Sequence, residues 1–136
     1  MIQRDYFLRE IERIGTITSA IRQKLMGSTD NLAITIEAQK ENTKEMLFFK
    51  IGFDLDKLLH LNTEELNAYM SEFDGFNAEN IEILADCLYQ IGFNDNCGNS
   101  KIYLEKALQL YELCNLKSKT FSFERETNIM AIKNIL

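Results

Sequence analysis

The sequence contains no proline among its 136 residues, and proline is the residue that interrupts helices most strongly. Its six glycines are scattered and form no phosphate-binding loop. No apolar run approaches the roughly 18 to 20 residues that a membrane-spanning helix requires. The first thirteen residues carry six charged side chains, which leaves no apolar core for a signal peptide. These absences favour a helical protein that has no contact with the membrane.

The residues of common catalytic and metal sites are also scarce. There is one histidine, His60, and no Gly-x-Ser-x-Gly motif with which it could pair. The three cysteines, Cys87, Cys97 and Cys114, lack the spacing of a zinc site. Their odd number is typical of a reduced, cytoplasmic protein. We therefore predict no catalytic residue, no metal site and no bound cofactor.

Basic side chains are few in the middle of the chain. The net charge is −6, but residues 53–100 carry ten acidic side chains and only one lysine, Lys57. Residues 1–27, in contrast, carry a net charge of +2. An acidic middle repels nucleic acid, so we expect no nucleic-acid binding. The same excess keeps a small domain soluble and can also attract a basic partner.

Enough apolar residues are present for a core. Hydrophobic residues make up 46% of the chain and charged residues 26%, shares that are typical of a globular domain rather than a disordered chain. A chain of this length can bury a sizeable core as one unit. We therefore predict a single domain over residues 1–136.

Two eight-residue stretches, residues 47–54 and 87–94, nearly repeat each other. In each, a glycine follows an apolar run and precedes phenylalanine and then Asp or Asn. Glycine adopts the left-handed conformation that ends many helices, and the next aromatic side chain can fold back onto the last turn. The pattern predicts two helix stops, formed by Gly52 with Phe53 and by Gly92 with Phe93.

Residues 1–27 have the spacing of a long helix. Its apolar side chains recur at intervals of three, four and seven residues, with Thr18 in one slot, and form a narrow seam of Phe7, Ile11, Ile14, Ile21 and Leu25. This N-terminal seam can pack across its own domain, which is the commoner fate of an apolar stripe, or against a second copy of the chain.

Later segments also have helical spacing. Asn62 and Glu65 have the arrangement of a capping box, and Asn77 is a predicted cap of the next helix. We further expect a helix over residues 32–51, a short turn from Asp54, and two helices after residue 100. The last of these is built on Phe123, Ile129, Met130, Ile132 and Leu136. The prediction is an all-α fold of about six helices plus a short turn, with a long N-terminal helix and antiparallel neighbours.

Three carboxylates, Glu79, Glu82 and Asp86, share one face of the helix that Asn77 is predicted to cap. Acids at this spacing can serve a di-metal site, but no matching Glu-x-x-His motif is present to complete it. Their face lies opposite the apolar stripe of the same helix. We therefore expect all three carboxylates to point into solvent.

Residues 77–136 resemble a divergent tetratricopeptide-like hairpin. The resemblance rests on Leu84, Ala85 and Leu88 in a first helix and on Ala107, Tyr111 and Cys114 in a second. The segments 2–6, 52–56, 62–66 and 111–126 together resemble an uncharacterised family of small bacterial all-helical proteins. This resemblance implies a cytoplasmic protein with tetratricopeptide-like packing, and it implies no activity.

These observations favour a non-enzymatic module that binds a protein or peptide between its helices, with acidic side chains steering the partner. A homodimer assembled through the N-terminal helix is a second hypothesis, compatible with the first. A small-ligand-binding or enzymatic protein with a pocket between helices is the third.

Overall fold

The computed structural model describes residues 2–27, 36–95 and 100–136. These residues form seven α-helices and no strand. The helices are α1 (Ile2–Gly27), α2 (Ile36–Ile51), α3 (Leu55–Leu59), α4 (Thr63–Ser71), α5 (Ala78–Asn94), α6 (Lys101–Lys117) and α7 (Phe123–Ile135). The all-α prediction is confirmed, and the predicted short turn after Asp54 is α3.

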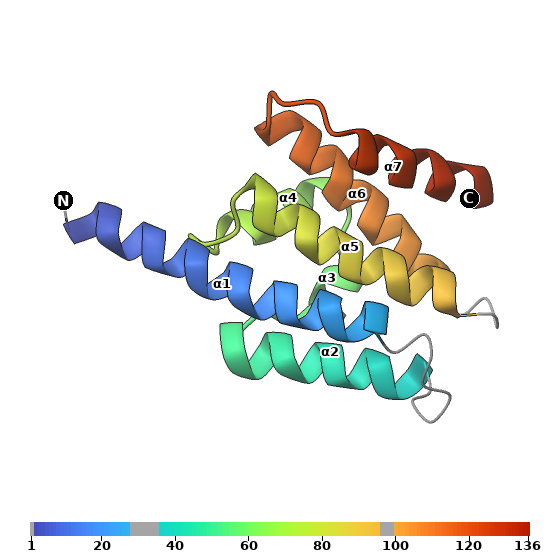
Figure 1. Cartoon of the computed structure of the whole chain (residues 1–136), viewed down its shortest axis with the longest axis horizontal. Coiled ribbons are helices and arrows are strands. Elements are labelled where there is room, and N and C mark those ends of the chain that lie inside the picture. Colours follow the sequence, from blue (N-terminus) through green and yellow to red (C-terminus); the bar gives the residue numbers. More distant parts are fainter. Residues whose placement is uncertain (1, 28–35, 96–99) are drawn as a thin grey trace.

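Helix α5 lies at the centre of the fold (Figure 1). It packs most extensively against α6, and α1 covers another of its sides. Helix α2 runs antiparallel to α1, and α7 runs antiparallel to α6 (Figure 1). Connections this short turn the chain back on itself, which explains the antiparallel pairs.

Helices α1 and α5 run in the same direction (Figure 1). This arrangement is possible because other helices separate them in the sequence. Near the start of both helices, Asn80 donates a hydrogen bond of 2.8 Å to the carbonyl oxygen of Ile11. About two turns further along both helices, the thiol of Cys87 lies 3.7 Å from the carbonyl oxygen of Thr18. These contacts hold the first half of α5 against the middle of α1.

The predicted caps of α4 and α5 are confirmed. Asn62 and Glu65 form the reciprocal capping box, in which each side chain accepts a hydrogen bond from the other residue's backbone N–H. Asn77 accepts a hydrogen bond of 2.9 Å from the backbone N–H of Asn80. Each cap satisfies a backbone donor that the first turn of a helix leaves free.

The predicted helix stop at Gly52 is present. Gly52 has a φ of +80°, and its N–H donates to the carbonyl oxygen of Phe48 at 2.9 Å. Phe53 is fully buried. The centroid of its ring lies 5.2 to 5.4 Å from the ring centroids of Tyr69, Phe73 and Phe76. The left-handed glycine thus turns the chain so that Phe53 enters the core.

The predicted stop at Gly92 with Phe93 is wrong. Helix α5 continues through both residues and ends at Asn94. A Cβ atom on Gly92 would lie 2.5 Å from Cγ and Cδ2 of Leu104, so the glycine is needed for the close approach of α6. Phe93 packs its ring against Tyr89, one turn earlier in α5, at 4.5 Å between ring centroids. The two similar stretches therefore serve different purposes.

A buried amide joins the start of α5 to α1. Asn80 is only 5% exposed, and its amide nitrogen donates to the carbonyl oxygens of Ile11 and Gly75, each at 2.8 Å. Gly75 passes so close to α1 that any Cβ there would collide with the carbonyl oxygen of Glu10. This junction fixes where α1 leaves the body of the protein.

Helix α7 buries less of its apolar side than predicted. Ile129 and Ile132 are buried in the core. Phe123, Met130 and Leu136 are instead exposed by 76%, 64% and 45%. Helix α7 contacts the body mainly through α6, so only one narrow side of it is covered.

Candidate functional site

The N-terminal seam divides into two parts. Ile14, Ile21 and Leu25 are buried in the core of their own chain. Ile11 is half-buried, and Phe7 is 41% exposed. The seam therefore packs across its own domain from Ile14 onward, and its first turns lie beyond the body (Figure 1).

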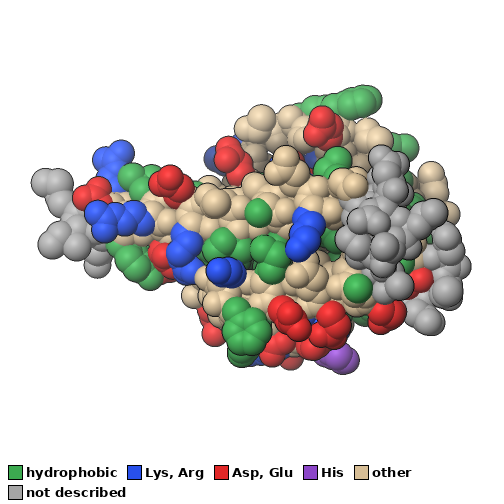
Figure 2. All heavy atoms as spheres, turned by 60° about the horizontal axis from the view of Figure 1, so that its bottom comes forward, with side chains coloured by type: hydrophobic (Ala, Val, Ile, Leu, Met, Phe, Trp, Pro, Cys, Tyr) green, Lys and Arg blue, Asp and Glu red, His purple; other side chains and the backbone are tan. Residues whose placement is uncertain are grey.

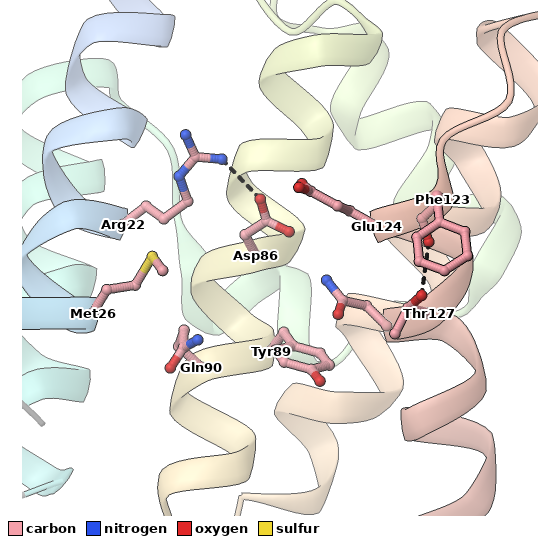
Figure 3. Close-up of a pocket in the computed structure, with 9 residues that line it drawn as sticks. Arg22, Met26, Asp86, Tyr89, Gln90, Phe123, Glu124 and Thr127 are labelled. Carbon is pink, nitrogen blue, oxygen red and sulfur yellow. Dashed lines mark hydrogen bonds and ion pairs between the residues drawn. The ribbon is translucent and has the colours of Figure 1, made fainter.

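A hollow opens between α1, α5 and α7, which are far apart in sequence. It has a volume of about 580 Å³. Figure 3 shows the side chains that line it, contributed by all three helices. They are Arg22 and Met26 of α1, Asp86, Tyr89 and Gln90 of α5, and Phe123, Glu124, Thr127 and Asn128 of α7. We refer to this hollow as the central cavity.

A chain of polar contacts crosses the central cavity. Asp86 accepts a hydrogen bond of 2.8 Å from Arg22 through one oxygen and of 2.5 Å from the Tyr111 hydroxyl through the other. The amide of Asn128 then donates to the Tyr111 hydroxyl at 3.1 Å. Four helices are connected in this way, because Tyr111 comes from α6 and Asn128 from α7. Asp86 is the junction of these contacts.

Burial controls the ionisation of this group of side chains. Loss of solvent raises the pKa of Asp86 above its ordinary value, and the hydrogen bonds from Tyr111 and Arg22 oppose that rise. Burial, together with the nearby carboxylate of Asp86, raises the pKa of the Tyr111 hydroxyl. The phenol therefore keeps its proton and remains a hydrogen-bond donor to Asp86.

The expectation that Glu79, Glu82 and Asp86 all point into solvent is wrong for two of them. Glu79 is exposed. Glu82 accepts a hydrogen bond of 2.5 Å from Arg125, a side chain only 6% exposed. Asp86 faces Arg22 at the cavity. Helix α5 is covered on several sides, so residues opposite its apolar stripe are also enclosed.

Sequence reasoning overlooked Arg22 and Asp86 as partners, since they lie 64 positions apart. Tyr111 was identified only as an aromatic residue of a helical hairpin. One signal was present in the sequence: α1 carries Arg22 on the side next to its seam, and α5 carries Asp86 next to its apolar stripe. Opposite charges beside two apolar stripes are typical of helices that pack together.

The thiols and the histidine form no common site. Cys87 and Cys114 are buried on α5 and α6, and burial raises the pKa of both thiols, that of Cys114 to about 12. His60 is exposed, and its Nδ1 lies 2.7 Å from the carbonyl oxygen of Asp56. Cys97 lies outside the described residues. Among the residues that are described, no three His, Cys, Asp or Glu side chains are arranged to hold a metal ion.

The walls of the central cavity combine apolar and polar side chains. Its carboxylate Asp86 accepts one hydrogen bond from Arg22 and one from Tyr111, each through a different oxygen. What faces the space is a set of apolar surfaces from Met26, Tyr89 and Phe123, with amide and carboxylate groups between them. Such a mixture binds by burial and by hydrogen bonding.

Compared with known proteins, the chain matches no protein family, no curated protein and no solved structure. A search of the described helices for a segment long and apolar enough to span a membrane finds none.

Proposed function

We propose that this protein is a non-enzymatic helical module that binds a protein or peptide in the central cavity. The observation that carries the proposal is an open cavity of about 580 Å³ whose walls come from three helices. A space of this size accommodates a few side chains of an extended or helical segment. The partner would be held by burial of its apolar side chains.

Apolar surface is already exposed where the partner would bind. Met26 is 54% exposed and Phe123 is 76% exposed, although both are large apolar side chains at the edge of the cavity. Covering such surface contributes about 25 cal/mol for each Å² removed from water. Aromatic and methionine side chains are common at the centre of protein interfaces.

Charge supports a partner with a basic side chain. The side chain of Glu124 extends from α7 toward Asp86 across the cavity (Figure 3). These two carboxylates face one basic side chain, Arg22, which already pairs with Asp86. A lysine or arginine of the partner placed beside Glu124 would meet a carboxylate and the rings of Tyr89 and Phe123. Carboxylates at the edge would also speed association.

We further propose that α5 and α6 form a tetratricopeptide-like hairpin, and their packing supports this proposal. The small and aromatic residues that carry the resemblance, Ala85, Leu88, Ala107, Tyr111 and Cys114, are all fully buried. Helical hairpins of that kind present grooves for peptides between neighbouring helices. Free thiols at Cys87 and Cys114 agree with a reduced compartment such as the bacterial cytoplasm.

Peptide selection against the purified protein tests the proposal. Peptides from a random display library are selected on the wild-type protein, and their affinity is measured by fluorescence anisotropy. Thr127→Arg places a long side chain in the cavity from an exposed position of α7. We expect the selected peptides to bind this variant at least tenfold more weakly.

Asn134→Arg is the matched control, because it makes the same change of charge at an exposed position of α7 outside the cavity. Binding to this variant should equal binding to wild type. The proposal is wrong if no peptide is selected, or if the Thr127→Arg protein binds the selected peptides as tightly as wild type does.

A further inference from the structure

The first turns of α1 form an arm that extends past the body of the protein (Figure 1). We define the arm as residues 2–9. Next to the arm, α1 meets the body at Glu10, which lies against Gly75, and at Ile11, which accepts a hydrogen bond from Asn80. Beyond them, Tyr6, Phe7 and Leu8 are exposed by 50%, 41% and 54%. A helix end with three large apolar residues in water is a surface that a partner would cover.

A second exposed aromatic surface lies where α2 ends. Phe48 and Phe49 are exposed by 55% and 77%, and their rings meet edge to face at 5.5 Å. They line a hollow of about 200 Å³ between α2 and α3 together with the carboxylates of Glu41, Glu45 and Asp54. We call it the α2–α3 hollow. Lys44, its one basic side chain, pairs with Asp56 at 2.9 Å.

We propose that two copies of the chain form a two-fold symmetric dimer in which the arm of each copy lies in the α2–α3 hollow of the other. This inference concerns a surface separate from the central cavity and does not depend on the proposed function. The occupant of the hollow is a second copy, because the same chain carries the complementary surface.

The geometry permits the exchange to be reciprocal. Arg13, at the base of the arm, donates a hydrogen bond of 2.6 Å to the carbonyl oxygen of Lys50, the residue after Phe49. The base of the arm and the aromatic pair are therefore adjacent. From Phe7 to Arg13 the helix rises about 9 Å, at 1.5 Å per residue. Two antiparallel arms would thus place each tip over the other's base, and the two contacts would be identical, as two-fold symmetry requires.

The charges of the two surfaces are complementary. The arm carries Arg4, Asp5 and Arg9, all exposed, for a net charge of +1, and the hollow carries Glu41 and Glu45, also exposed. In Figure 2 basic side chains, with acidic ones between them, lie along the arm, and acidic side chains gather along the lower edge of the same face beside apolar ones. In an exchanged dimer each basic tip would meet an acidic hollow, whereas like charges would oppose a parallel arrangement.

The exposed apolar area sets the expected strength. An aromatic side chain presents about 150 to 250 Å². From the exposed fractions of the three arm side chains and of Phe48 and Phe49, roughly 500 Å² of apolar surface per copy can be buried, or roughly 1,000 Å² per dimer. Specific interfaces begin near about 1,200 Å². We therefore expect a weak dimer whose population rises with protein concentration.

Exchange of charges between the two surfaces tests the proposal by sedimentation velocity. The arm variant carries Arg4→Glu with Arg9→Glu, and the hollow variant carries Glu41→Lys with Glu45→Lys. Wild type should shift from monomer to dimer with concentration, and each variant alone should remain monomeric. An equimolar mixture of the two variants should form dimers again, because both contacts of the mixed dimer then join opposite charges.

Phe49→Ser removes an exposed apolar side chain from the α2–α3 hollow. Leu116→Ser is its matched control outside the hollow, because the two side chains are exposed to nearly the same degree, 77% and 78%. Phe49→Ser should weaken the dimer at least tenfold, and Leu116→Ser should leave it unchanged. The proposal is overturned if wild type stays monomeric at every accessible concentration. It is also overturned if the mixed variants fail to associate, or if both serine variants behave alike.

Discussion

Replacing Gly92 by alanine distinguishes two reasons for having glycine at this position. In the middle of a helix alanine is favoured over glycine by about 1 kcal/mol. The added Cβ would, however, lie 2.5 Å from Cγ and Cδ2 of Leu104, where carbon atoms normally keep about 3.5 to 4.0 Å. Overpacking of a core costs about 1 to 3 kcal/mol. We expect Gly92→Ala to lower the free energy of unfolding by about 1 kcal/mol.

The sign of this effect should reverse when Leu104 is shortened. Leu104→Ala alone costs about 2 to 5 kcal/mol, as other buried leucines do. In that background Cγ and Cδ2 of residue 104 are gone and only its backbone nitrogen, 3.3 Å from the new Cβ, remains close, so Gly92→Ala should stabilise the protein by up to about 1 kcal/mol. The two substitutions thus have a coupling energy of about 2 kcal/mol, measured by urea unfolding followed by circular dichroism.

A helix stop would give a different result. If Gly92 were needed for a left-handed conformation, alanine would destabilise the protein equally with either residue at position 104, and the coupling would be zero. That outcome would refute the packing argument. Gly52→Ala is the control: Gly52 has open space around it and a φ of +80°, so its cost should be the same in both backgrounds.

Three further predictions concern single residues. Gly52→Ala should lower the free energy of unfolding, measured in a thermal melt, by about 1 kcal/mol. Gly52→Asn should lower it less, because asparagine tolerates the left-handed conformation. Equal losses of stability in the two variants would contradict this reason. Asn80→Ala should lower the free energy of unfolding, measured in urea, by about 2 kcal/mol, because the carbonyl oxygens of Ile11 and Gly75 lose their hydrogen-bond donor. Asn80→Asp should lower it further, because its carboxylate repels both oxygens. A smaller loss for Asn80→Asp than for Asn80→Ala would refute the role of Asn80 as a donor. Burial raises the pKa of Asp86 above 3.8, so the folded protein binds more protons than the unfolded chain between that value and the raised pKa, and stability falls as pH rises through this window. Asp86→Asn removes this titration, so its stability relative to wild type should increase from acidic to neutral pH in urea titrations; a constant difference would contradict the raised pKa.

Local signals in the sequence predicted the helices well. The capping box at Asn62 and the cap at Asn77 depend on residues three positions apart, so they are visible without a structure. The all-α class followed from the same kind of signal. The glycine of each repeated stretch shows the limit of this approach. Residues 47–54 and 87–94 have nearly the same local pattern, and what separates them is the arrival of Leu104 from another helix.

The central cavity was not predictable for a related reason. The apolar stripe of α5 predicts one covered side, whereas α1 and α6 cover two sides of the helix and Arg125 of α7 reaches Glu82. Asp86 lies outside the stripe and is nevertheless half-buried. Its partners Arg22 and Tyr111 are 64 and 25 positions away, and no periodicity connects such distances. The N-terminal seam, predicted to pack across its own domain or against a second copy, was likewise divided by where the body of the protein ends.

The pairing of α1 with α5 determines the order in which the chain can fold during synthesis. The hydrogen bond between Ile11 and Asn80 cannot form until the ribosome has added the 69 residues that separate them. At about 5 to 20 residues per second, a ribosome needs roughly 3 to 14 s to supply them. Throughout that interval the buried half of α1 has only α2 to cover it. Helix α1 is thus made seconds before α5 can cover it, and its apolar side is open to chaperones, or to another nascent copy, for that time.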